Sequence, residues 1–184
     1  MNGLRRRIAE VQVAFMLLTR LPAGRLGGGP PELAAAKWAF PLTGLVVGGS
    51  FAGVYITMSS LALPASLAAI LALGVSVMMT GGLHEDGLAD CADGFGGGQT
   101  KDQKLAIMKD SQVGSYGVLA LVLVIAARMV ALATMPATAQ SLILLISLAM
   151  ISRMMMVVYL DWLPSARAEG LGYDAGKDGG LSVF

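Results

Sequence analysis

The sequence predicts an all-α protein, a polytopic integral membrane helical bundle. Of its 184 residues, 55% are hydrophobic and only 14% are charged, whereas an ordinary soluble domain is about 25% charged. The 46 consecutive residues from Trp38 to Leu83 contain no Asp, Glu, Lys, Arg or His. The long apolar segments show no helical period that would divide them into wet and dry faces. This argues against a soluble helical core.

Composition excludes several other classes of protein. The apolar content is too high for intrinsic disorder, and a single cysteine, Cys91, cannot form a disulfide scaffold. The net charge of +1 gives no field that would steer nucleic acid toward the chain. We therefore expect membrane lipid around the protein and no nucleic-acid partner.

Four membrane spans are expected, because a span needs about 20 apolar residues. The first uncharged stretch holds two spans divided near Pro64, and a second pair is divided near Pro136. The predicted spans cover residues 39–63, 65–83, 114–135 and 139–160. Together with a segment at 84–113 and a polar tail at 161–184, they form one membrane domain covering residues 1–184.

The basic residues predict the orientation of these spans. Six Lys or Arg residues precede the first span, three lie between the second and third, and two follow the fourth. The turns at 59–66 and 134–140 carry no charge. Because cytoplasmic loops are enriched in Lys and Arg, both termini and the 84–113 segment are expected in the cytoplasm. The chain is thus predicted to be a multi-pass protein of the cell (inner) membrane.

An N-terminal helix is predicted before the first span. Ile8, Val11, Phe15 and Leu18 recur at helical spacing behind a basic cluster at residues 5–7. This pattern is typical of an amphipathic helix lying on the anionic cytoplasmic face, and a short additional span is the alternative.

Two small-residue motifs lie in the first span, Gly44-x-x-x-Gly48 and Gly49-x-x-x-Gly53. Glycines at this spacing let helix backbones approach closely. We interpret both motifs as packing features and not as chemistry.

The segment from 85 to 110 holds six of the twelve acidic residues. If the second span continues as a helix, Asp86, Asp90 and Asp93 lie within about 60° of one another on one face. Like charges so close repel, and a bound divalent cation would remove that repulsion. Carboxylate ligands suit Mg²⁺ or Mn²⁺ better than Zn²⁺. The sequence therefore predicts a metal site at these three residues, with Glu85 as a weaker candidate and a solvated loop as the alternative.

Two further residues lie beside this acidic face. His84 is about 160° from Asp86 around such a helix, so we do not expect both to bind one ion. A proton-transfer role and a purely structural role stay open for His84. Cys91 points away from the acidic face and is expected to be buried.

A glycine-rich run at 94–98 follows the acids. Glycine permits close approach of the backbone to an anion, but no Gly-Lys-Ser/Thr ending marks a P-loop, and a flexible turn is the commoner explanation. Thr100 and Gln103 then fit a capping box that opens a second cytoplasmic helix. That helix is expected to carry Lys101, Lys104, Lys109 and Asp110. Acids, a glycine turn and lysines are together what a diphosphate substrate requires.

Arg128 and Arg153 lie inside the third and fourth spans. A charge there costs at least ~2.5 kcal/mol, so an intramembrane arginine is a functional-site hypothesis by default. Each arginine could pair with the acidic cluster or with a substrate phosphate. An ion pair with Asp161 or with a residue such as Asp110 is the structural alternative.

Residues 80–117 resemble the signature region of the cobalamin synthase family, adenosylcobinamide-GDP ribazoletransferase. The family pattern is close to Gly-Gly-x-His-x-Asp-Gly-Leu-Ala-Asp-x-x-Asp-Gly, followed by an Ile-Met-Lys/Arg-Asp-Ser segment and a Gly. This chain supplies the pattern at Gly81, Gly82, His84, Asp86, Gly87, Leu88, Ala89, Asp90, Asp93 and Gly94, and then at Ile107, Met108, Lys109, Asp110, Ser111 and Gly114. Flanking pieces also resemble the family, so the resemblance runs along nearly all of the chain.

The resemblance implies a membrane-bound, Mg²⁺-dependent transferase that completes the nucleotide loop of cobalamin. A hydroxyl of α-ribazole, or of its 5′-phosphate, attacks the phosphorus attached to cobinamide in adenosylcobinamide-GDP, and GMP leaves. On this reading the catalytic candidates are Asp110 and His84 as proton acceptors and Lys109 on phosphate. The substrate-binding candidates are Arg153, Arg128, Lys104, Ser111, Gly96 and Gly97.

Members of this family usually continue further, with additional helices and a Gly-x-Thr-Gly-Asp segment that this sequence lacks. We therefore expect a fragment, a truncated product or a divergent short form. An inactive truncated member that scaffolds partners is one alternative function. A divalent-cation transporter with the acidic face as its entry site is another, and homo-oligomerisation is left open.

Overall fold

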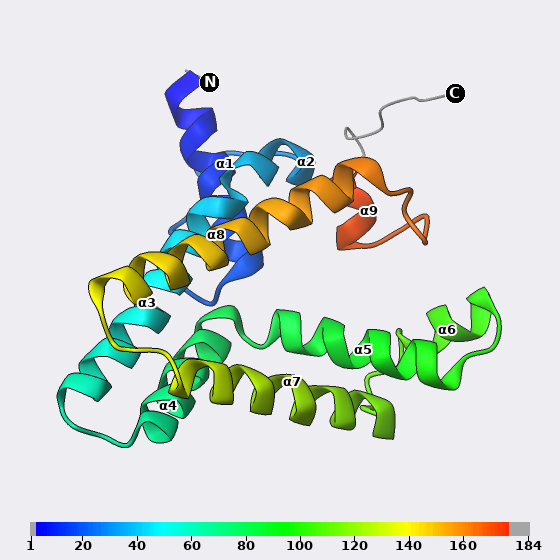
Figure 1. The fold of residues 1–184 in the computed structure, drawn as a ribbon. Helices are drawn as coiled ribbons and strands as arrows, with labels where there is room; N and C mark the ends of the chain where they lie inside the picture. The colour runs from blue at the N-terminus through cyan, green and yellow to red at the C-terminus, as the bar shows by residue number, and fades with distance from the viewer. Residues whose placement is uncertain (1–2, 177–184) are drawn as a thin grey trace. The chain divides into compact units, whose positions relative to one another are not determined.

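The structure, a computed structural model, describes residues 3–176, and in these it contains helices and linkers but no strand (Figure 1). The expected all-α class is confirmed. Lys177 and the rest of the predicted polar tail after residue 176 lie outside the described residues. The helices are α1 (Gly3–Leu18), α2 (Leu33–Ala36), the 3-10 helix η1 (Lys37–Ala39), α3 (Phe40–Ser60), α4 (Ala65–Thr80), α5 (Leu83–Gly97), α6 (Lys101–Ile107), α7 (Ser115–Ala133), α8 (Ala139–Trp162) and α9 (Leu171–Gly176).

Several of these helices are long and apolar enough to cross a membrane. Three described stretches meet that condition by length and composition, namely Leu33–Ser60, Ser115–Ala133 and Ala139–Trp162. They correspond to the predicted first, third and fourth spans. The pair α4 and α5 would make a fourth span, although the two helices are bent by 89°.

The second predicted span differs from the structure. Its helix, α4, has 16 residues, or about 24 Å at 1.5 Å per residue, which is less than the ~30 Å of a bilayer core. It ends because Gly81 and Gly82 adopt left-handed φ angles of 66° and 73°. Their N–H groups donate to the carbonyls of Met78 and Val77. The expected continuous helix through residue 83 is therefore wrong, and the chain turns there into α5.

The chain divides into two compact units, unit 1 (Met1–Gly53 and Thr138–Phe184) and unit 2 (Val54–Ala137). Each unit is described by itself below. The boundary falls inside α3, where the sequence is uniformly apolar, so no change of composition marks it. A single membrane domain over the whole chain stays a prediction.

Unit 1 has a core in which α1 packs against the start of α3. Ala14 and Leu18 lie buried with Ala39 and Phe40. The apolar residues packed around this core are Val11, Leu17, Leu42, Met156, Val157 and Leu160. The predicted N-terminal helix is confirmed, and part of its apolar face covers protein, whereas Ile8 is exposed. A location of α1 on the membrane surface stays a prediction.

The two glycine motifs of α3 have different surroundings. A Cβ atom added at Gly44 would lie 2.6 Å from the carbonyl oxygen of Ala149, and one at Gly48 would lie 2.7 Å from the Cβ of the same residue. The first motif therefore packs α3 closely against α8, as predicted. At Gly49 and Gly53 the described residues place nothing within 4 Å, so the second motif has no such contact here.

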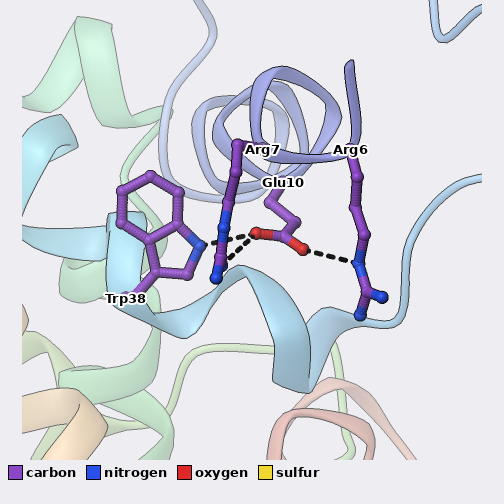
Figure 2. A network of polar contacts seen from close by, with 4 residues as sticks. All are labelled: Arg6, Arg7, Glu10 and Trp38. Atoms are coloured by element: carbon purple, nitrogen blue, oxygen red, sulfur yellow. Dashed lines mark hydrogen bonds and ion pairs between the residues drawn. The ribbon is translucent and has the colours of Figure 1, made fainter. Parts of the chain in front are cut away.

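A buried carboxylate ties α1 to η1 (Figure 2). Glu10 is 1% exposed, and its Oε2 accepts hydrogen bonds from Arg7 Nη1 at 2.8 Å and Trp38 Nε1 at 2.7 Å. Arg6 Nε donates to Oε1 at 3.0 Å. Burial raises the pKa of Glu10, but the hydrogen bonds from Trp38, Arg7 and Arg6 outweigh that effect and hold the pKa below its ordinary value. The sequence pattern does not predict this network.

Candidate functional site

The predicted acidic segment is a helix, α5, that packs along α7 and also contacts α4 and α6 within unit 2 (Figure 1). The helix contains Asp86, Asp90 and Asp93, so their predicted helical spacing is confirmed and the solvated-loop alternative is wrong. Asp86 is exposed, Asp90 is partly buried and Asp93 is buried. The acidic face therefore runs from an open surface into the contact with α7.

Asp93 binds the backbone of α7. Asp93 is only 9% exposed. Oδ2 accepts a hydrogen bond from Gly114 N at 2.7 Å, and Oδ1 accepts one from Gly117 N at 2.9 Å. Both carboxylate oxygens of this predicted metal ligand are thus engaged by N–H groups at the start of a helix.

Glu85 binds Arg128 across the same helix pair. The distance from Arg128 Nη1 to Glu85 Oε1 is 3.2 Å. Arg128 lies 13 residues after Ser115, the first residue of α7, which is about 20 Å along a helix. Of the partners that the sequence leaves open for Arg128, the structure shows one from the acidic cluster, Glu85, and the substrate-binding role of Arg128 stays a prediction. Glu85, the weaker metal candidate, is an ion-pair partner in this structure.

His84 and Cys91 also lie on α5. His84 is partly buried. It lies on the same helix as Asp86, so the two side chains are separated by about 160° around the helix, as predicted. Cys91 is exposed, so the expectation of burial is wrong. The buried residues Ala89 and Asp93 are each two positions away, or about 200° around the helix, which turns Cys91 away from α7.

The glycine-rich run is helical through Gly97, so the expected turn at 94–98 is wrong. A Cβ added at Gly96 would lie 2.5 Å from the Tyr116 ring, and one at Gly94 would lie 2.6 Å from Met108 Cε. At Gly97 the nearest atom would be Ile107 Cδ1, at 3.3 Å. These glycines let α5 approach α6 and α7, and helical N–H groups at such positions donate within the helix.

The predicted capping box at the start of α6 is confirmed. Gln103 N donates to Thr100 Oγ1 at 3.3 Å, and Gln103 Oε1 accepts from Thr100 N at 3.1 Å. The side chain of Lys104 lies beside α5, with Nζ 5.0 Å from the centre of the Phe95 ring. Lys101 begins the helix and is exposed.

The helix α6 ends at Ile107, earlier than predicted. Lys109 N and Asp110 N donate to carbonyls three residues earlier, at Ala106 and Ile107, which tightens the chain into a turn. Lys109, Asp110 and Ser111 are all exposed in this turn. The expectation that Lys109 and Asp110 lie on this helix is therefore wrong. Asp110 Oδ1 accepts a hydrogen bond from Gln112 N at 3.1 Å.

Arg153 lies in α8 and belongs to unit 1, whereas the acidic helix belongs to unit 2. Asp161, which the sequence leaves open as a partner of an intramembrane arginine, forms an ion pair with Lys37. This contact joins η1 to the end of α8 within unit 1. Sequence reasoning missed it because the two residues are 124 positions apart.

No three His, Cys, Asp or Glu side chains within residues 3–176 are gathered closely enough to hold a metal ion by themselves. Asp86, which is exposed, and Asp90, which is partly buried, lie one helical turn apart on α5. In proteins Mg²⁺ is usually held by one or two carboxylates together with waters and substrate phosphates. The chemistry of these two donors fits Mg²⁺ in that form.

Comparison with known proteins identifies the family. The model of the family described as cobalamin-5-phosphate synthase matches residues 10–181. The chain belongs to this family. Curated relatives carry the name adenosylcobinamide-GDP ribazoletransferase, a transferase of cobalamin synthesis. One, from Bradyrhizobium diazoefficiens, is 41% identical over 181 residues, and another, from Azorhizobium caulinodans, is 41% identical over 180 residues.

The match covers nearly all of this chain but not all of the relatives. It spans 98% of this chain and 70% of the Bradyrhizobium protein, and 95% and 68% in the Azorhizobium comparison. A relative from Xanthobacter autotrophicus is 46% identical over 139 residues, which is 72% of this chain and 52% of that protein. No solved structure matches the chain.

Proposed function

We propose that this chain catalyses the Mg²⁺-dependent joining of adenosylcobinamide-GDP with α-ribazole or its 5′-phosphate. The observation that carries the proposal is the family match along residues 10–181, which includes the whole acidic helix. The products are adenosylcobalamin, or its 5′-phosphate, and GMP. The name of the curated relatives supports the substrates, adenosylcobinamide-GDP and a ribazole.

The chemistry is a substitution at phosphorus. A hydroxyl oxygen of the ribazole forms a new bond to the phosphorus attached to cobinamide, and the bond from that phosphorus to the oxygen of the GMP phosphate breaks. GMP leaves with the electron pair of the broken bond. Mg²⁺ held by Asp86 and Asp90 would neutralise charge on the diphosphate oxygens.

The remaining candidate residues bind phosphate or take the proton. Lys109 and Lys104 supply ammonium groups near the α5–α6 pair. Arg153, which lies in α8 of unit 1, is a phosphate-binding candidate from the sequence alone. The Asp110 carboxylate, exposed in the turn after α6, accepts the proton of the attacking hydroxyl, with the imidazole of His84 as the second candidate. Ser111, Gly96 and Gly97 are the remaining substrate-binding candidates. Ser111 is exposed in the turn after α6, whereas the two glycines lie inside α5.

The proposed location is the cell (inner) membrane, with both termini and α6 on the cytoplasmic side and α5 extending from there along α7. The distribution of Lys and Arg supports this orientation, and the apolar helices support a membrane protein. Water-soluble substrates with a diphosphate would meet the acidic helix from the cytoplasm.

The test uses the whole 184-residue chain purified in lipid nanodiscs. Adenosylcobinamide-GDP and α-ribazole are added with Mg²⁺, and GMP release and the corrinoid product are measured by chromatography. Asp86→Asn and Asp90→Asn should each lower the rate on the order of 100-fold or more, because each removes a metal-binding carboxylate. Asp102→Asn is the matched control, since Asp102 is exposed on α6 and has no proposed role.

Different results separate the alternatives. Absence of GMP release from the wild-type chain would overturn the proposed activity for this chain and favour an inactive family member. Uptake of ⁵⁴Mn²⁺ into vesicles without GMP release would favour the cation transporter. Full activity in either Asp variant would overturn the metal assignment.

A further inference from the structure

We infer that Asp93 is a positioning residue that supplies both halves of a capping box to α7, and not a ligand of Mg²⁺. The metal part of this inference rests on the proposed function, whereas the capping part rests on the hydrogen bonds alone. In an ordinary capping box, the N-cap side chain accepts from the N–H of the third helical residue, and that residue's side chain accepts from the N-cap N–H. Here the Asp93 carboxylate, on α5, accepts the hydrogen bonds from both of these N–H groups of α7.

The start of α7 cannot make this box from its own residues. Its N-cap is Gly114, which gives no side-chain hydrogen bond, and its third residue is Gly117. These two positions donate to Asp93 at 2.7 and 2.9 Å. The first N–H groups of a helix have no partner inside it and carry partial positive charge. A buried carboxylate therefore satisfies two of them and is itself neutralised.

The two glycines are required by this contact. A Cβ atom added at Gly114 or at Gly117 would collide with the carboxylate oxygens of Asp93, and the one at Gly117 would also lie 3.1 Å from the carbonyl oxygen of Ala89. Because the N-cap and the third residue of α7 are both glycine, α5 can pack closely against the start of α7. The position of α5, and with it the position of Asp86 and Asp90, follows from this junction.

Ligation of Mg²⁺ by Asp93 would have to use the second lone pair of an oxygen that already accepts a backbone N–H. Its residue is 9% exposed, whereas Asp86 is exposed and Asp90 is partly buried. Two carboxylates and substrate phosphates already complete a common form of Mg²⁺ site. We therefore assign Asp86 and Asp90 to the metal and Asp93 to the junction of α5 with α7.

The first test measures thermal unfolding of the full chain in nanodiscs with EDTA and without substrate. Asp93→Asn should lower Tm by about 5 °C, because an amide oxygen cannot accept both N–H groups as a carboxylate does. Asp86→Asn is the matched control and should change Tm by much less, since Asp86 is exposed and the relief of like-charge repulsion on α5 offsets the loss of a negative charge in its first turn. An unchanged or raised Tm for Asp93→Asn would overturn the capping role. This measurement of Tm requires neither bound metal nor enzyme activity.

The second test measures kinetics of the same variants. In Asp93→Asn we expect kcat per folded molecule to fall about tenfold through displacement of α5, with the Mg²⁺ concentration for half-maximal rate within twofold of wild type. Asp86→Asn should raise that concentration. A raised Mg²⁺ requirement in Asp93→Asn would indicate that Asp93 binds Mg²⁺ and would overturn the inference. An unchanged kcat would reduce its role to stability and overturn the positioning role.

The third test uses the wild-type chain and stays decisive if Asp93→Asn fails to fold. Amide hydrogen exchange at Gly114 and Gly117 is followed by mass spectrometry of residues 111–120 with and without Mg²⁺ and inorganic diphosphate. Slow exchange that Mg²⁺ leaves unchanged is expected. Faster exchange on adding Mg²⁺ would show Asp93 moving from the helix to the metal and would overturn the inference. If GMP release fails but these amides stay slow, the proposed function fails and the junction stands.

Discussion

Glu10 in unit 1 and Asp93 in unit 2 are both buried carboxylates, and they are neutralised by different groups. Three side chains, Arg6, Arg7 and Trp38, donate to Glu10. Two backbone N–H groups at the start of α7 donate to Asp93. The arginine side chains are 66% and 64% exposed, so the first arrangement is open to water and salt. The second depends on rigid backbone and on the absence of two Cβ atoms.

This difference sets how each region responds to change. The arginine ends of the Glu10 pairs are exposed, so salt screens them. Loss of one of the three donors to Glu10 also leaves the other two in place. Backbone donors cannot be replaced by a neighbouring rotamer, and a Cβ at the junction pushes two helices apart. We therefore expect unit 2 to be the more sensitive region, and the following experiments test that order.

The largest effect is expected from Gly117→Ala. The added methyl would collide with the Asp93 carboxylate and approach the Ala89 carbonyl, so the free energy of unfolding should fall by ~2–3 kcal/mol. Gly87→Ala on α5 is the control, because nothing lies within 4 Å of its added Cβ, and alanine there should stabilise by up to ~1 kcal/mol. Equal Tm values for the two variants in nanodiscs would contradict the comparison.

An intermediate effect is expected from Trp38→Phe. The substitution keeps an aromatic ring beside Arg7, which lies 5.5 Å from the Trp38 ring centre, but removes the indole N–H that Glu10 accepts. The free energy of unfolding should fall by about 1 kcal/mol. Trp162→Phe is a matched control, since Trp162 is exposed at the end of α8. A loss larger than that of Gly117→Ala would reverse the order proposed for the two regions.

The smallest effect is expected from acid. The pKa of Glu10 is lowered in the folded chain from its ordinary value of 4.5, so the unfolded chain binds a proton more readily. Stability from this group is present above pH 4.5 and is lost as pH falls through the lower folded pKa. Glu10→Gln should remove that part of the pH dependence in Tm measured between pH 6 and the acid limit of the nanodisc. An unchanged acid profile would show that Glu10 contributes none of it.

Local patterns predicted much of the fold. Apolar runs predicted α3, α7 and α8, and the 3.6-residue period predicted that the three aspartates share one helix. The capping box at Thr100 and Gln103 was readable because both partners lie within one turn. In each case the interacting residues are neighbours in sequence, so spacing alone is sufficient.

Contacts between distant residues were not predictable in the same way. Asp93 and Gly117 are 24 positions apart, and Glu10 and Trp38 are 28 apart. One signal for the first contact was present, since Gly114-x-x-Gly117 opens an apolar helix without any capping side chain. The break at Gly81 and Gly82 was also marked by consecutive glycines, but their left-handed φ angles depend on the helices that follow.

The capping of α7 by Asp93 also gives an order to the assembly of unit 2. The chain is synthesised from its N-terminus, so the residues of α5 are made before those of α7. Only 24 positions separate Asp93 from Gly117, and closing so short a loop costs little entropy. The beginning of α7 can therefore complete its hydrogen bonding on α5 once residues 83–117 have been made. This junction needs no residue from the helices that follow α7.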